Sequence, residues 1–200
     1  MSVLLDILGS TIIGGLLLIM ALNILDTTTS YYFGQNDDLI VQENLTTLTQ
    51  ILEYNLRKMG FAVPEGRAVI IFADSSQLMY LGDNDGDWQP DTVQFYLGGR
   101  YELNNTRNPN DRFIYRKVNS QPANGAIIGV VTMFDFTYLD QDGQVVDESY
   151  PANYSAIKMI RITLQVESSD VYTADPNPAS TEYRRAFWQQ TRLVSRNLRR

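Results

Sequence analysis

The 200-residue sequence contains no cysteine and no histidine. Without cysteine the chain cannot form a disulfide or a thiolate metal site, so its redox compartment cannot be inferred from composition. Without histidine it also lacks the imidazole that most often serves as a general base and as a zinc ligand. Any catalysis would therefore depend on carboxylates. A content of 44% hydrophobic and 11% aromatic residues is still enough for a core.

Positive charge is scarce at the start of the chain, because no lysine or arginine precedes Arg57. The net charge is −7, yet residues 184–200 contain six arginines and no acid. The rest of the chain holds 10 basic and 23 acidic residues, which gives −13 against +6. A body this acidic argues against nucleic-acid binding, which needs a basic face.

Residues 3–25, VLLDILGSTIIGGLLLIMALNIL, form an apolar run about as long as a membrane-spanning helix. The run lacks the basic start of a secretory signal peptide, so we expect a retained anchor. Asp6 is a lone charge within it, and a carboxylate at the centre of such a helix costs about 2.5–3.5 kcal/mol, less near an end. The nearest available cation is an N-terminal amine, from the same chain or from a neighbour. Alternatively, Asp6 is a helix N-terminal acid stabilised by the helix dipole.

The same run contains three glycines, Gly9, Gly14 and Gly15. Small residues allow helices in lipid to pack closely, although membrane helices also tolerate glycine without such a role. We favour close packing. Asp6, Gly9, Gly14 and Gly15 are therefore the residues that we expect to carry assembly with neighbouring copies.

Three aromatic residues, Tyr31, Tyr32 and Phe33, follow the apolar run. Their rings suit either the edge of a membrane or packing on a globular domain. We place the end of the first unit here. Residues 1–33 are predicted to form an apolar helix that serves as a membrane anchor or as the core of a filament.

Residues 34–60 are predicted to continue this helix in amphipathic form. Asp37 and Asp38 could cap its start, and Gly60 is placed to end it. If Gly34 only bends the path, the two helical units make one rod of roughly 85 Å at 1.5 Å per residue. Apolar residues recur at spacings of three and four along one face: Val41, Leu45, Leu48, Leu52, Leu56 and Met59.

Residues 61–200 change to the pattern of strands and turns. A long helix followed by antiparallel strands predicts an α+β fold. Residues 168–181, with two prolines, are expected to form a long loop. The predicted strands are 68–73, 77–81, 92–97, 113–118, 130–139, 158–166 and 186–194, with turns at 83–87, 98–99, 108–110 and 140–143.

Several segments share their pattern with one known family. Residues 2–6, SVLLD, place an acid after a short apolar entry, and residues 51–61, ILEYNLRKMGF, end a helix with an arginine and a glycine–aromatic pair. A strand–loop–strand, a hairpin and an arginine–asparagine ending occupy residues 72–97, 112–143 and 191–198. Together these segments resemble the type IV pilin and pseudopilin superfamily, most closely its PilW-like minor pilins.

This resemblance implies a subunit of a helical filament, with apolar helices in the core and β-domains on the surface. If Met1 is removed, Asp6 stands where the family keeps a glutamate, with a side chain one methylene shorter. The resemblance implies that this acid pairs with the terminal amine of an adjacent subunit. It also implies copies of itself or other pilin-like subunits as partners, and the cell surface as location, after an inner-membrane stage.

An acidic turn offers a candidate metal site. Asp83, Asp85 and Asp87 stand at alternate positions, and oxygen ligands of this kind suit calcium. Asp91 could add a further ligand, although the turn does not match the EF-hand template. The alternative is a solvated acidic hairpin. We expect no other cofactor.

The arginines of residues 184–200 allow two interpretations. They form either a solvated strand end or a contact with the acidic surface of a neighbouring subunit, which salt would weaken. The overall functional prediction is a structural, non-enzymatic filament subunit. The alternatives are a membrane-anchored binding or adhesion module that does not polymerise, and a type II secretion pseudopilin. A hydrolase would need two carboxylates in one cleft, and the sequence singles out no such pair.

Overall fold

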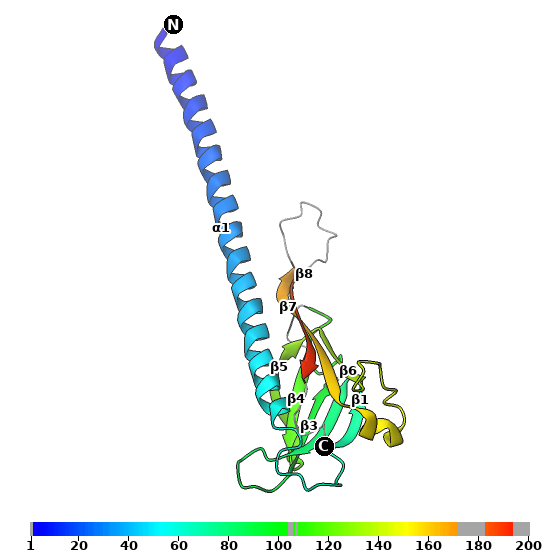
Figure 1. The fold of residues 1–200 in the computed structure, drawn as a ribbon. Coiled ribbons are helices and arrows are strands. Elements are labelled where there is room, and N and C mark those ends of the chain that lie inside the picture. Colours follow the sequence, from blue (N-terminus) through cyan, green and yellow to red (C-terminus); the bar gives the residue numbers. More distant parts are fainter. Residues whose placement is uncertain (1, 104–105, 107, 172–182, 194–200) are drawn as a thin grey trace.

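A computed structural model describes residues 2–103, 106, 108–171 and 183–193. One long helix, α1 (Ser2–Arg57), precedes a β-rich domain. Its C-terminal half lies beside the domain, whereas its N-terminal half projects beyond it (Figure 1). The following elements are β1 (Ile70–Asp74), β2 (Gln77–Gly82), β3 (Asp91–Leu97), β4 (Arg112–Val118), β5 (Gln121–Val131), β6 (Met133–Leu139), the 3-10 helix η1 (Pro151–Ala156), β7 (Met159–Val171) and β8 (Tyr183–Leu193).

The helix is continuous over 56 residues, which corresponds to about 84 Å at 1.5 Å per residue. It passes through Gly34 without interruption. A glycine inside a helix costs only about 0.5–1 kcal/mol relative to alanine, so the helical segments on both sides can carry it. The prediction that Asp37 and Asp38 cap a helix start is therefore wrong, because both lie within the helix.

The end of the helix is fixed to the β-domain. The helix ends at Arg57, and the chain turns at Gly60, whose φ of 73° lies in the left-handed region that suits glycine. The Gly60 N–H donates to the carbonyl of Leu81 in β2 at 2.8 Å. The buried Tyr80 hydroxyl donates to the carbonyl of Asn55 at 2.9 Å. The predicted helix end close to Gly60 is thus confirmed.

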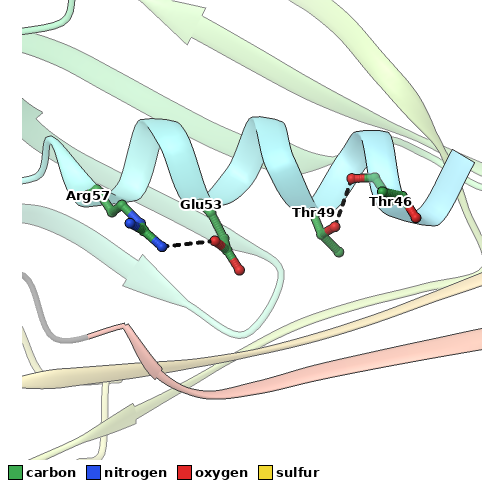
Figure 2. A network of polar contacts seen from close by, with 4 residues as sticks. All are labelled: Thr46, Thr49, Glu53 and Arg57. Atoms are coloured by element: carbon green, nitrogen blue, oxygen red, sulfur yellow. Dashed lines mark hydrogen bonds and ion pairs between the residues drawn. The ribbon is translucent and has the colours of Figure 1, made fainter. Parts of the chain in front are cut away.

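The C-terminal half of α1 is amphipathic, as predicted. On its polar side the Thr49 hydroxyl donates to the carbonyl of Thr46 at 2.8 Å, and Arg57 pairs with Glu53 at 3.2 Å (Figure 2). Such an i,i+4 ion pair is worth about 0.3–0.5 kcal/mol, so it does not hold the helix in place. Burial of the apolar face does, through Val41, Leu48, Leu52 and Leu56, and Met59 is buried just after the helix ends.

The strands form two antiparallel sheets. The first has the order β1-β2-β3-β4-β5 and the second the order β6-β7-β8. The helix contacts β5, β7 and β8, and side chains from the helix and both sheets join in one hydrophobic core. This arrangement confirms the α+β class and the antiparallel pairing.

The strand predicted at 130–139 divides at Thr132, where the chain passes from the first sheet to the second. The Thr132 N–H donates to the carbonyl of Gln165 in β7 at 2.9 Å. Val131 and Phe134 are both buried although they are three residues apart, which shifts the alternation of inward and outward side chains. A single strand would require an even spacing.

Most of β5 was not predicted, because Pro122, Gly125 and Gly129 weaken its strand pattern. Both glycines are needed for packing. A Cβ at Gly125 would lie 3.0 Å from the Tyr96 hydroxyl, and a Cβ at Gly129 would overlap Leu48 of α1. Close contact between elements therefore explains why glycine occupies positions 125 and 129, although glycine disfavours strands.

The region near the C-terminus differs from the prediction in one respect. Strand β7 continues to Val171, so the first part of the expected loop at 168–181 is strand. Residues 172–181 lie outside the described residues. Strand β8 agrees with the predicted strand at 186–194 except at its ends, and Val194 also lies outside the described residues.

Candidate functional site

The N-terminal half of α1 presents its apolar side chains to its surroundings. The segment Val3–Thr29 has a mean hydropathy of 2.3, and its most apolar stretch is entirely unburied. By length and composition it could cross a membrane. We call residues 3–29 the apolar rod. Its large exposed side chains are Val3, Leu4, Leu5, Ile7, Leu8, Ile12, Ile13, Leu16, Leu17, Leu18, Ile19, Met20, Leu22, Ile24 and Leu25.

The size of this apolar surface decides what the rod requires. The fifteen side chains are 53–76% exposed. Burying a large apolar side chain is worth about 1.5–3 kcal/mol, which sums to an upper estimate of roughly 20–45 kcal/mol. A typical domain has a net stability of about 5–15 kcal/mol. The rod therefore needs apolar surroundings, supplied by lipid or by other rods.

The hydroxyl groups of Ser10 and Thr11 are satisfied inside the helix. Ser10 and Thr11 both donate to the carbonyl of Ile7, at 2.9 and 3.0 Å. Side chains that bond back to the helix are tolerated in apolar surroundings. In the part of the chain that the structure describes, Asp6 has neither a hydrogen-bond partner nor an ion-pair partner for its carboxylate.

Asp6 is also far from the basic side chain of its own helix. The first basic side chain, Arg57, follows 51 residues later on the same helix, about 77 Å away at 1.5 Å per residue. The β-domain lies beside the other half of the helix (Figure 1). Among the described residues no basic side chain pairs with Asp6, so the partner that we expect is an N-terminal amine or a cation of another molecule.

The three glycines predicted for assembly make no contact that explains them. A Cβ at Gly9, Gly14 or Gly15 would meet nothing within 4 Å. Gly9 is three residues from Asp6 and shares its side of the helix, whereas Gly15, nine residues on, lies on the opposite side. The structure thus brings Asp6 and Gly9 together but not all four residues. Close packing against a second helix stays a prediction.

The aromatic residues after the apolar run are exposed where the structure describes their side chains. Tyr31 and Tyr32 are 66% and 67% exposed, so they do not pack on the β-domain. The side chain of Phe33 lies outside the described part of the chain. Exposed rings at this end of the rod suit the edge of a membrane.

The acidic turn brings together a slightly different set of carboxylates from the predicted one. Oxygens of Asp83, Asp85 and Asp91 lie within 4.8 Å of one another, and Asp87 is not part of this group. Asp83 and Asp91 are buried, whereas Asp85 is exposed. The group offers oxygen ligands of the kind that calcium prefers.

These carboxylates already bind the turn itself. Asp83 accepts hydrogen bonds from the N–H groups of Gly86 at 2.6 Å and Trp88 at 3.0 Å, and Asp91 accepts one from Asn84 at 2.9 Å. The same turn carries positive charge, since Lys58 donates to the Asn84 carbonyl at 2.7 Å. Bracing of the turn therefore explains the buried acids without a metal, and calcium binding stays a prediction.

A second polar cluster was not predicted. The buried Asn108 donates to Glu167 of β7 at 2.9 Å, and Gln165 donates to the same carboxylate at 2.8 Å. Burial raises the pKa of the nearby Asp111. This cluster ties the β3–β4 connection to β7. The single signal in the sequence was the Asn-Pro-Asn turn, which does not reveal a contact with a residue 59 positions away.

A cavity of about 690 Å³ lies between the turn after α1 and η1. Glu65 is the one carboxylate among its described lining residues, which also include Arg67 and Lys158. The cavity thus does not supply the pair of acids that a carboxylate-dependent hydrolase would use.

The arrangement is therefore an exposed apolar rod that carries Asp6, continued by an amphipathic half that is fixed on a domain of two sheets. The likeness to pilins stays a prediction based on sequence segments and this order of elements. No family model, curated protein or solved structure matches the chain.

Proposed function

We propose that this chain is a structural subunit of a type IV pilus-like extracellular filament that polymerises through its apolar rod. One observation carries the proposal: 27 residues of exposed apolar helix are joined without a break to a folded domain. Copies packed side by side would bury one another's rods and display their β-domains outside. Before assembly the same rod would hold each copy in the inner membrane.

Asp6 gives this packing its specificity. Its carboxylate is neutralised by the N-terminal amine of a neighbouring copy, because the first basic side chain of its own helix is about 77 Å away. In a bundle that excludes water, removing one member of such a buried pair costs about 3–5 kcal/mol. Each subunit makes this contact, so the loss recurs along the whole filament.

The experiment is electron microscopy of cells that produce the full chain, with Asp6→Ala, Asp6→Glu and Asp26→Ala as variants. We expect filaments from the wild type, from Asp6→Glu, which keeps the charge, and from Asp26→Ala, which removes an acid at the far end of the run. Asp6→Ala should remain in the membrane fraction without filaments. Filaments of normal number from Asp6→Ala would contradict the proposal.

Two alternatives predict other outcomes. The exposed rod and the exposed Tyr31 and Tyr32 equally suit a single anchor in a bilayer, which would serve a surface binding or adhesion module. That module would not polymerise, and Asp6→Ala would leave it unchanged. A type II secretion pseudopilin would assemble, but its short polymers would stay within the cell envelope.

A further inference from the structure

Two aromatic side chains lie exposed together where α1 meets the β2–β3 connection. Trp88 is 75% exposed and Phe61 is 42% exposed, and their ring centroids are 5.4 Å apart. The exposed Asp85 and Asp87 precede Trp88 in the same turn. We call these four residues the aromatic tip. Tryptophan is enriched among the residues that carry most of the binding energy at protein interfaces.

The backbone holds Trp88 in an unfavourable conformation. Its φ of 65° lies in the left-handed region, which large side chains rarely adopt. The Trp88 N–H donates to Asp83 at 3.0 Å, and the Asp83 side chain is buried with its residue only 2% exposed. A glycine would fit this position with less strain. The fold thus keeps an indole ring outside at a structural cost, which is typical of sites that bind.

The negative charge around the Trp88 ring favours the binding of a cationic group. Residues 83–91 contain four aspartates and no basic residue. In the described part of the chain, Lys58 and Arg116 reach the turn, and both donate to Asn84. Among the described residues, Asp85 and Asp87 have no ion-pair partner. An indole face beside carboxylates attracts a guanidinium group, through cation–π and charge-assisted contacts.

We propose that the aromatic tip binds the arginine-rich segment 192–200 of a second copy of this chain. The segment holds four of the six arginines of residues 184–200 and no acid, whereas the chain outside residues 184–200 has a net charge of −13. The tip and the segment are different patches, so their contact is head-to-tail and can repeat in an open polymer. The choice of a second copy as partner rests on the proposed filament function.

The test is binding of a labelled peptide with the sequence of residues 191–200, TRLVSRNLRR, to the full chain in detergent micelles. Micelles keep the rods apart, so packing between rods does not contribute to the fluorescence anisotropy of the peptide. We expect saturable binding that weakens several-fold between about 0.1 M and about 0.5 M salt. A peptide with glutamine in place of every arginine should not bind.

Matched variants locate the site. Trp88→Gly removes the ring and suits the backbone, and it should weaken peptide binding about threefold to tenfold while the protein stays folded. A double variant, Asp85→Asn with Asp87→Asn, should weaken binding to a similar extent. Tyr101→Ala and Asp142→Asn, which change an exposed ring and an acidic turn elsewhere, should bind normally.

Three results would overturn the inference. The first is absence of binding to any form of the chain, and the second is equal binding by Trp88→Gly and the wild type. The third is binding only to a chain shortened after Leu193, which would show that the segment covers the tip of its own molecule. None of these results depends on filaments, so each leaves the Asp6 proposal to its own test.

Discussion

Leu48 of α1 lies against Gly129 of β5 at a distance that leaves no room for a side chain on the glycine. A Cβ at Gly129 would overlap the Leu48 side chain, which belongs to a residue only 2% exposed and enclosed by the core. Helix and sheet therefore meet here in direct contact. This contact fixes the amphipathic half of α1 on the domain and thereby sets where the apolar rod projects.

Gly129→Ala tests this contact. Because Leu48 cannot move into solvent, we expect the added methyl group to lower the free energy of unfolding by about 1–3 kcal/mol. The measurement is chemical denaturation in detergent, followed by tryptophan fluorescence. Gly99→Ala is the control, since its Cβ would meet only the exposed Glu102 side chain. Equal stability of Gly129→Ala and the wild type would show that the contact is looser than described.

Stability should fall at alkaline pH because of two buried tyrosines. Burial raises the pKa of Tyr80 and of Tyr138 far above the ordinary value of 10.0. Above about pH 10 the unfolded chain releases protons that the folded chain retains. The free energy of unfolding then decreases by about 1.4 kcal/mol per pH unit for each tyrosine, until the pH reaches the folded-state pKa.

Tyr80→Phe isolates one of these contributions. The variant should show a shallower decline of stability with pH above 10, and Tyr150→Phe, which changes an exposed ring, should decline as the wild type does. At neutral pH Tyr80→Phe also removes one of two hydrogen bonds to the Asn55 carbonyl, which still accepts from the Lys58 N–H at 3.1 Å, and this loss costs about 0.5–1.5 kcal/mol. An unchanged slope in Tyr80→Phe would contradict the assignment.

Asp83→Asn should loosen the acidic turn. Both Asp83 oxygens accept backbone N–H groups, and an amide offers only one oxygen acceptor. We expect a loss of about 1–3 kcal/mol in the free energy of unfolding. Faster amide hydrogen exchange at Gly86 and Trp88 would locate the loss. Normal exchange at both amides would show that the carboxylate does not brace the turn.

Calcium binding at this turn is tested separately. If calcium binds the group of Asp83, Asp85 and Asp91, its addition raises the unfolding temperature of the wild type, because a ligand of the folded state stabilises it. Asp85→Asn should abolish the rise, since Asp85 belongs to the carboxylate group, and Asp87→Asn should preserve it. An unfolding temperature of the wild type that does not change with calcium would show that the turn does not bind calcium and is a hairpin braced by its own hydrogen bonds.

Sequence periodicity predicted the parts of the fold that depend on local patterns. The spacing of Leu48, Leu52 and Leu56 gave the buried face of α1, and Gly60 marked its end. The change of sheet at Thr132 could not be predicted, because it depends on a hydrogen bond to Gln165 in a distant strand.

The acidic turn shows why site residues are harder to predict than elements. Alternate spacing suggested Asp87 as a partner of Asp83 and Asp85. In the structure, Asp91 pairs with Gly82 across the β2–β3 hairpin, which places it beside Asp83. Trp88, whose backbone has a left-handed conformation, lies between Asp87 and Asp91 in the chain. Spacing along a chain does not report such a reversal of direction.

The central claim is that Asp6 is neutralised by another copy of the chain. The most direct measurement is a cryo-electron microscopy map of the native assembly at side-chain resolution. We expect a helical polymer in which each Asp6 carboxylate lies within about 4 Å of the N-terminal nitrogen of an adjacent subunit, the range of an ion pair. Single molecules in a bilayer, with Asp6 hydrated and no second copy alongside, would contradict it.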